Sequence, residues 1–142
     1  MRRNVSYFFL AAVTLAACTK KEMSDLTGTR FHGTWEWIKT EGGIANNIHE
    51  TPQSTGKRIT LQMTIENRYV ITVNDAISSQ GFYTAESRKC MHDGTTKSFL
   101  NFSEEKDKDL MVESVGENTL ILSDEAHDGL TSTYGRQTSN VK

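Results

Sequence analysis

Two short segments of the chain combine residue types that bind metal ions. His92-Asp93-Gly94-Thr95-Thr96 and His127-Asp128-Gly129-Leu130-Thr131 share four of their five residues. Imidazole and carboxylate groups are metal ligands, so two such segments could meet around one ion. Asp-Gly is also a frequent hairpin-turn dipeptide, because glycine adopts a positive φ without steric cost. We favour the turn interpretation and expect neither a metal site nor another cofactor.

Cys90 lies two residues before His92, and a thiol with an imidazole is a combination used in nucleophilic catalysis. Side chains two apart in one strand or loop rarely meet as nucleophile and base, and no third group that would orient the histidine can be named. The chain also lacks a Gly-x-Ser-x-Gly elbow, a His-Glu-x-x-His pair and a glycine-rich phosphate loop. We therefore expect a protein that is not an enzyme.

The first residues of the chain carry a targeting pattern. Arg2 and Arg3 precede a short apolar stretch that ends in Leu15-Ala16-Ala17-Cys18. A positive start, an apolar middle and small residues before a cleavage point are typical of a secretory signal. The last four residues resemble the bacterial lipobox, which implies that Cys18 is acylated and becomes the new N-terminus. The alternative is a transmembrane anchor, but the uncharged run is shorter than the roughly 20 apolar residues that a spanning helix needs.

Lipidation at Cys18 would place the protein in the bacterial cell envelope and make the membrane its first partner. Thr19 follows the cysteine, where aspartate is the usual inner-membrane retention signal, so we expect the outer membrane, on its periplasmic or surface face. Cys90 would then be the other, unpaired cysteine, and we expect it to be buried rather than available for intermolecular chemistry. A formal net charge of −2 gives no basic surface for nucleic acid.

After residue 30 the dominant sequence period is two, which is typical of β-strands with one buried face. Ile59, Leu61, Met63 and Ile65 alternate with polar residues. Seven further segments have strand-like composition. They are Gly33–Lys39, Arg68–Asn74, Gly81–Glu86, Lys97–Phe102, Leu110–Val115, Thr119–Ser123 and Leu130–Gln137.

Eight short strands joined by tight turns predict an all-β fold, and sequential hairpins favour a small antiparallel up-and-down β-barrel. Closing the barrel removes exposed strand edges. We expect three segments: a lipoprotein signal peptide over 1–17, a lipidated N-terminus and tether over 18–29, and the barrel domain over 30–142.

Residues at the two ends of this domain resemble the lipocalin-like (calycin-type) family of barrels. Gly33-Thr34-Trp35 looks like the family's Gly-x-Trp signature, and Tyr134 with Arg136 resembles its closing strand. Thr51–Lys57 and the stretch from Leu122 to Gly129 are also similar to small bacterial lipocalin-like lipoproteins. The resemblance implies that Gly33, Trp35 and Arg136 close the barrel, with the Arg136 guanidinium against the Trp35 indole. The family's larger secreted members are longer and often carry disulfides and a terminal helix, and this sequence shows a pattern for neither.

The inward side of the predicted barrel is apolar and aromatic. We expect it to contain Trp35, Trp37, Met63, Ile71, Phe82, Leu100, Phe102, Leu122 and Tyr134. Eight strands enclose either a packed core or one small ligand. If the barrel is hollow, the ligand-binding residues are Trp37, Met63, Ile71, Phe82, Leu100, Phe102 and Tyr134. If it is filled, the same side chains form an ordinary close-packed core.

Two further segments could contribute to function. The stretch from Thr40 to Gly56 is long and rich in small polar residues. It is either a lid over the barrel mouth, as in lipocalin-like proteins, or a loop without a role. Glu104–Asp109 is a run of six charges, which we expect to form a solvated hairpin tip.

These observations favour a membrane-anchored lipoprotein whose barrel binds a small apolar or amphipathic ligand without catalysis. The alternative is a structural or interaction lipoprotein with a filled barrel, which contacts a protein partner in the envelope. A third interpretation is an inhibitor or scavenger that presents its loops to a target.

Overall fold

The computed structural model describes residues 30–104 and 107–138. The expected signal peptide, Cys18 and the tether lie outside the described residues. The elements are nine strands and two short helical segments: β1 (Gly33–Gly42), a 3-10 turn (Ile44–Asn46), β2 (Ile48–Glu50), α1 (Pro52–Thr55), β3 (Ile59–Met63), β4 (Arg68–Val73), β5 (Ala76–Lys89), β6 (Thr96–Phe102), β7 (Leu110–Val115), β8 (Thr119–Ser123) and β9 (Leu130–Arg136).

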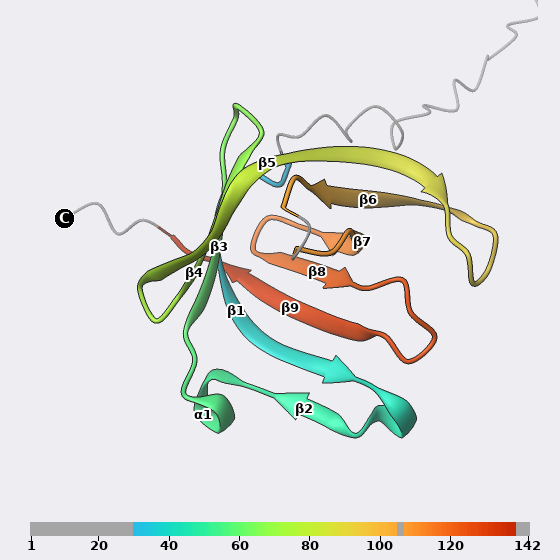
Figure 1. The fold of residues 1–142 in the computed structure, drawn as a ribbon, viewed down its shortest axis with the longest axis horizontal. Coiled ribbons are helices and arrows are strands. Elements are labelled where there is room, and N and C mark those ends of the chain that lie inside the picture. The colour runs from blue at the N-terminus through green and yellow to red at the C-terminus, as the bar shows by residue number, and fades with distance from the viewer. Residues whose placement is uncertain (1–29, 105–106, 139–142) are drawn as a thin grey trace, which may run out of the picture.

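Eight of these strands form a closed antiparallel barrel. The hydrogen-bonded order runs from β1 through β3, β4, β5, β6, β7, β8 and β9, and β9 pairs back onto β1. Figure 1 shows this ring, with β2 and α1 lying outside it beside β1. Every neighbouring pair is antiparallel, and all the pairings lie within residues 33–136. The prediction of a small up-and-down β-barrel is confirmed.

The expected strands match the observed ones to within a few residues, except that β5 is much longer than Gly81–Glu86. Its first half pairs with β4 and its second half with β6. The expectation that Ile65 faces the core is wrong, since β3 ends at Met63 and Ile65 lies in the following turn with 74% of its surface exposed. That turn contains Asn67 at φ 57, a conformation that asparagine tolerates better than most residues.

The stretch from Thr40 to Gly56 is folded. β1 extends through Gly42, and β2 then pairs with residues 40–42 along the free edge of β1. Thr51 caps the N-terminus of α1 in a capping box with Ser54, and Pro52 begins the helix. Gly56, at φ 68, ends it. The segment therefore lies beside the barrel wall, as an extension of β1.

The barrel interior is filled toward one end by a cluster of buried side chains. It consists of Phe31, Trp35, Leu61, Met63, Tyr69, Tyr83, Leu100, Leu120 and Leu122. Phe82 was expected among the inward residues, and this expectation is wrong: 57% of its surface is exposed. Because β5 alternates, Tyr83 occupies the inward position and Phe82 points outward, where it lies under the guanidinium of Arg68.

The ends of the barrel sheet meet at Gly33, Trp35 and Arg136. The Arg136 guanidinium lies 4.0 Å from the centre of the Trp35 ring, and Trp35 is fully buried. Arg136 also donates hydrogen bonds to the carbonyls of Glu117, of His32 at 2.5 Å and of Arg30 at 3.1 Å. Gly33 has φ +132, and a methyl group there would overlap the guanidinium. Glycine is therefore required beside Arg136.

A second, smaller apolar cluster consists of Cys90, Phe99 and Met111. Phe99 and Leu100 are adjacent on β6, so Phe99 lies on the face opposite the barrel interior. The Arg88 guanidinium lies 3.7 Å from the centre of the Phe99 ring. Cys90 is buried, as expected. Among the described residues, no helix is long and apolar enough to cross a membrane.

Candidate ligand-binding site in the barrel

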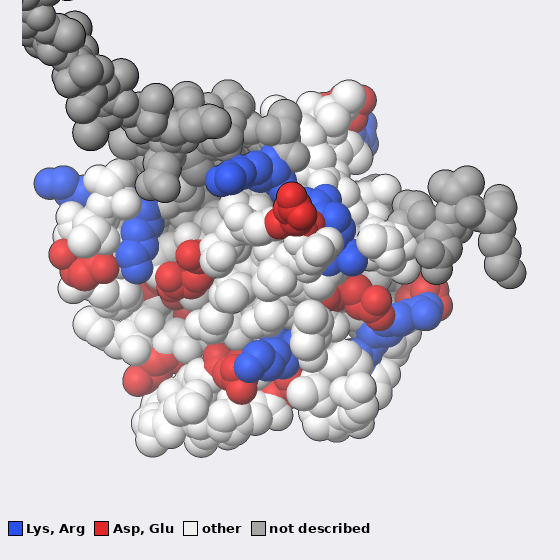
Figure 2. Space-filling view, turned by 180° about the vertical axis from the view of Figure 1, so that it is seen from behind, with Lys and Arg blue, Asp and Glu red and all other residues white. Residues whose placement is uncertain are grey.

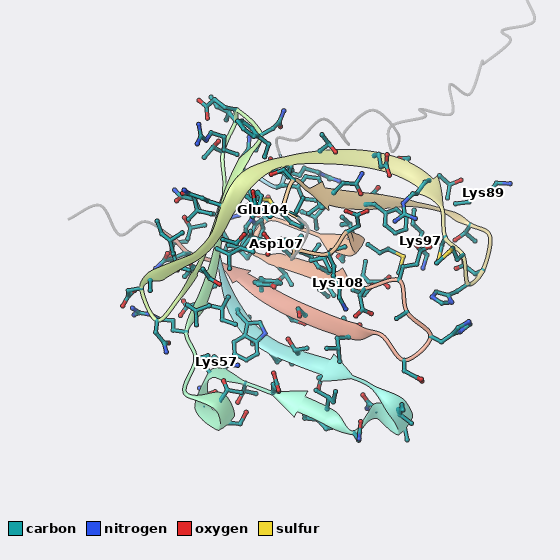
Figure 3. All side chains as sticks on the ribbon, viewed as in Figure 1. Lys57, Lys89, Lys97, Glu104, Asp107 and Lys108 are labelled. Carbon is teal, nitrogen blue, oxygen red and sulfur yellow. The ribbon has the colours of Figure 1, made fainter. Side chains whose placement is uncertain are left out.

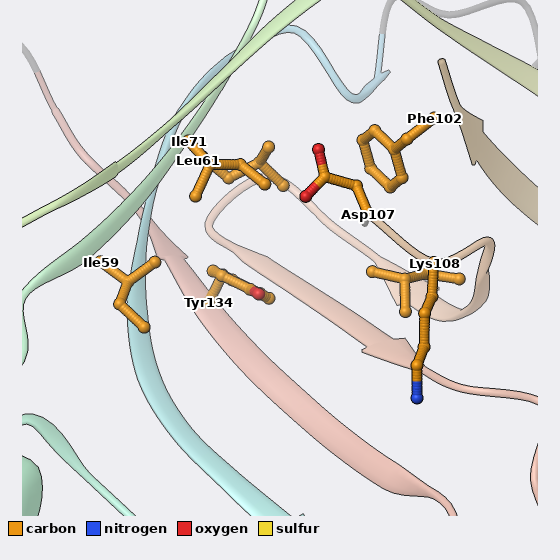
Figure 4. Close-up of a pocket in the computed structure, with 8 residues that line it drawn as sticks. Ile59, Leu61, Ile71, Phe102, Asp107, Lys108 and Tyr134 are labelled. Atoms are coloured by element: carbon orange, nitrogen blue, oxygen red, sulfur yellow. The ribbon is translucent and has the colours of Figure 1, made fainter. Parts of the chain in front are cut away.

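A cavity of about 290 Å³ opens inside the barrel, away from the filled end. Its apolar wall comes from five strands and consists of Ile59, Leu61, Ile71, Phe102, Leu110 and the ring of Tyr134. Asp107 and Lys108, from the connection between β6 and β7, complete the lining (Figure 4). Ile59 is the first residue of β3, whereas Met63, the last, pairs with Gly33 at the closed end.

The predicted ligand-binding residues lie in different places in the structure: in the cavity lining, in the buried core and on the outer surface. Ile71, Phe102 and Tyr134 line the cavity. Met63 and Leu100 are buried in the filled part of the barrel. Trp37 is buried as well, but it is not part of the cavity lining, and Phe82 is on the outer surface.

The indole of Trp37 belongs to a chain of polar contacts. Its Nε1 donates to the hydroxyl of Thr40 at 2.9 Å, and this hydroxyl lies 2.8 Å from that of Ser132. A bulge in β1 between Trp37 and Lys39 shifts the register, which turns Thr40 inward. Trp37 therefore has its polar group satisfied inside the wall, and its position is explained by packing.

Sequence reasoning missed five lining residues: Ile59, Leu61, Asp107, Lys108 and Leu110. The alternating pattern of β3 already contained the signal for Ile59 and Leu61. Nothing in the pattern marks Asp107, because a run of charges normally lies in solvent. The expectation of a wholly solvated tip over Glu104–Asp109 is wrong for Asp107, which is half-buried, whereas Glu104, Lys108 and Asp109 are exposed.

Asp107 is held in the barrel by two hydroxyl groups. Its Oδ2 accepts hydrogen bonds from the Tyr69 hydroxyl and from the Ser79 hydroxyl. Gly81 on β5 makes room for this arrangement, since a methyl group there would press against the Tyr69 ring and overlap the Ser103 hydroxyl. Ser103, at the start of the connection, accepts the amide proton of Phe82 and so fixes the connection to β5.

Burial raises the pKa of Tyr69 above its usual value, and the hydrogen bond to Asp107 raises it further. Burial also raises the pKa of Tyr134. Both phenols therefore remain protonated at neutral pH. Tyr69 keeps its role as the hydrogen-bond donor to Asp107.

The charged groups of the β6–β7 connection point in different directions. In Figure 4 the Asp107 carboxylate points toward Leu61 and Ile71, whereas the Lys108 ammonium points away from them. Figure 3 shows Asp107 and Lys108 within the ring of strands, while Lys57 and Lys89 lie toward its periphery. Among the described residues, the carboxylate is the one acidic group in the cavity lining.

The two similar His-Asp-Gly segments do meet on the outside of the barrel. The rings of His92 and His127 are 4.5 Å apart between centroids, at an angle of 66°. Glu125 ties the loops together by accepting the Met91 amide at 2.6 Å and the Arg88 guanidinium at 2.7 Å. Within the part of the chain that the structure describes, no three His, Cys, Asp or Glu side chains are grouped so that they could hold a metal ion.

Both segments form turns, although only the first has its glycine at a positive φ; in the second, the Gly129 amide donates to the Ala126 carbonyl at 2.9 Å. Gly94 has φ +67, as a turn glycine commonly does, and Asp93 accepts the Thr95 amide at 2.9 Å. Asp124 accepts the Leu130 amide at 2.9 Å in the second loop. Cys90 packs with Phe99 and Met111, so its thiol belongs to an apolar cluster.

Acidic and basic side chains are interspersed among uncharged ones on the face seen in Figure 2. That face has no broad area of one sign that would attract a polyelectrolyte. Comparisons with family models, with curated proteins and with solved structures gave no match to this chain. The cavity and its lining are the features of this chain that bear on its function.

Proposed function

We propose that this chain is a lipid-anchored, lipocalin-like protein of the bacterial envelope that binds a small amphipathic molecule in its barrel without transforming it. The observation that carries this proposal is the cavity of about 290 Å³ with six apolar lining residues and one inward carboxylate. Ligand sites are typically concave, mostly apolar and supplied with a few polar groups that orient the ligand. The volume limits the ligand to a small molecule.

Binding would be driven by removing apolar surface from water. Leu61 is almost fully buried, and Ile71, Phe102, Leu110 and Tyr134 are partly buried against the core, so the wall is held in place before a ligand arrives. A preformed apolar wall avoids the entropic cost of ordering side chains on binding. The ligand's apolar part would lie against this wall, and its polar end would lie toward Asp107.

Membrane anchoring is the second part of the proposal. Acyl chains on Cys18 would hold the protein at the outer membrane, and residues 19–29 would connect the lipid to the barrel. The barrel closes through pairings within residues 33–136, so it does not need the anchor to complete its sheet. The lipid and the small ligand are the two partners that this proposal requires.

A neutral apolar fluorescent probe, N-phenyl-1-naphthylamine, tests the cavity. The chain lacking residues 1–18 retains all the residues that form the strand pairings, and circular dichroism checks its fold before titration. Ile71→Phe fills the cavity, and we expect it to weaken probe binding by roughly tenfold or more. Ile77→Phe is the matched control, because Ile77 is exposed and does not line the cavity. Absence of saturable probe binding to the unaltered protein would contradict the proposal.

The filled end of the barrel favours the alternative of an interaction lipoprotein. The buried cluster there contains nine side chains, among them Trp35 and Tyr83, and only Leu61 of the nine also lines the cavity. In that case the remaining cavity would be a packing defect, and the protein would act through its surface. Unchanged probe binding in both Ile71→Phe and Ile77→Phe would move the weight to this alternative.

A further inference from the structure

The cavity contains the Asp107 carboxylate, which forms no ion pair with any residue that the structure describes. Its neighbours in the cavity lining are Leu61, Ile71 and Phe102, and these groups cannot compensate a negative charge. A carboxylate surrounded by apolar groups is costly unless it is both hydrogen-bonded and paired with a cation.

The hydrogen bonds of Asp107 satisfy only part of this requirement. Both hydroxyl donors, Tyr69 and Ser79, end on Oδ2. No side-chain hydrogen bond between described residues ends on Oδ1, although an ionised carboxylate has about four acceptor positions. Tyr69 and Ser79 thus fix the direction of the carboxylate and leave acceptor capacity toward the cavity.

Lys108 is next in the chain but does not neutralise Asp107. The Lys108 side chain is exposed, and its ammonium points away from the carboxylate and from Leu61 and Ile71. A charge in water is screened, whereas a charge between apolar groups is not. Asp107 therefore determines which sign of charge the interior of the cavity favours.

We infer that the ligand of this barrel is a small apolar amine, whose protonated nitrogen pairs with Asp107 and whose hydrocarbon part lies against the apolar wall. This inference rests on the proposed function and adds the chemical class of the ligand. The ammonium would accept no hydrogen bond and would donate to the carboxylate, and none of the described residues forms that ion pair with Asp107. An alkyl carboxylate of the same length would instead meet like charge at Asp107.

Three ligands of equal chain length test the inference: octylamine, octanol and octanoate. Each is titrated into the chain lacking residues 1–18, with displacement of N-phenyl-1-naphthylamine as the readout at pH 7 and low salt. We expect octylamine to bind roughly tenfold more tightly than octanol, and octanoate to bind most weakly. This comparison uses the unaltered protein, so it does not depend on whether a variant folds.

Asp107→Asn is the corresponding variant, because an amide oxygen still accepts from Tyr69 and Ser79. We expect octylamine and octanol to bind it with equal affinity. Glu104→Gln is the matched control: it removes one negative charge from the same connection at an exposed position, and it should keep the tenfold preference.

Three outcomes separate the inference from the function on which it rests. Octanol binding as tightly as octylamine, or an amine preference that persists in Asp107→Asn, overturns the inference while the binding function stands. Octanoate binding most tightly, with loss of that preference in Lys108→Met, assigns the ligand's head group to Lys108 and also overturns it. Failure of all three ligands to displace the probe overturns the inference together with the proposed function.

Discussion

Replacing Arg136 by methionine should open the contact that joins the two ends of the barrel sheet. Methionine keeps an unbranched side chain of similar reach but has no charge and no N–H donors. It removes the guanidinium from the Trp35 ring, where it lies at 4.0 Å. It also removes the donors to the carbonyls of Arg30, His32 and Glu117.

The expected cost follows from these contacts. A cation over an indole contributes about 0.5–2 kcal/mol, depending on its exposure. Hydrogen bonds from a charged group contribute about 1.5–3 kcal/mol each, although three on one half-buried side chain do not add fully. We therefore expect Arg136→Met to lower the free energy of unfolding by about 2–4 kcal/mol.

Urea unfolding followed by tryptophan fluorescence and far-UV circular dichroism measures this difference. Arg58→Met is the matched control, because Arg58 forms an exposed ion pair with Asp75, and such pairs contribute about 0–1 kcal/mol. A double-mutant cycle with Trp35→Leu should give a coupling energy of about 0.5–2 kcal/mol. If Arg136→Met costs no more than Arg58→Met, or if the coupling is zero, the closure argument is refuted.

Three other changes test separate parts of the account. Gly33→Ala should cost about 1–3 kcal/mol of stability, because it combines a strained φ with overlap against Arg136, and Gly94→Ala in open space should cost less. The hydrogen bond from the Met91 amide lowers the pKa of Glu125, so the unaltered protein should have a higher urea midpoint than Glu125→Gln at neutral pH. This difference in urea midpoint should disappear as the pH falls through the lowered pKa of Glu125. Cys18→Ser should release the protein from membranes into the soluble fraction, and unchanged membrane retention would contradict lipid anchoring there.

Much of the barrel could be predicted because its strands obey one local rule. Alternation along β3 and β5 reflects a sheet with one face on the core, and this period is visible without any tertiary information. The errors at Phe82 and Ile65 show where this local rule fails. An aromatic residue next to another aromatic, or an apolar residue just past a strand end, does not reveal which of two adjacent positions faces inward.

The candidate site was harder to predict, because it depends on a contact between distant segments. Asp107 lies in a run of charges, and only its meeting with Tyr69 and Ser79 distinguishes it from its neighbours. The same applies to His92 and His127, whose rings meet across two loops. The position of β2 was equally hard to predict. β3 pairs only with residues 33–36 of β1, which leaves residues 40–42 of the same edge available to β2.

The most direct test of ligand binding in the barrel is an NMR titration of methyl-labelled protein with octylamine. The account predicts that the methyl groups of Ile59, Leu61, Ile71 and Leu110 shift and saturate together. The methyl groups of the exposed residues Ile38, Ile44 and Ile77 should stay unchanged. Shifts confined to the exposed isoleucines, or no saturable shift at all, would contradict a ligand site inside the barrel.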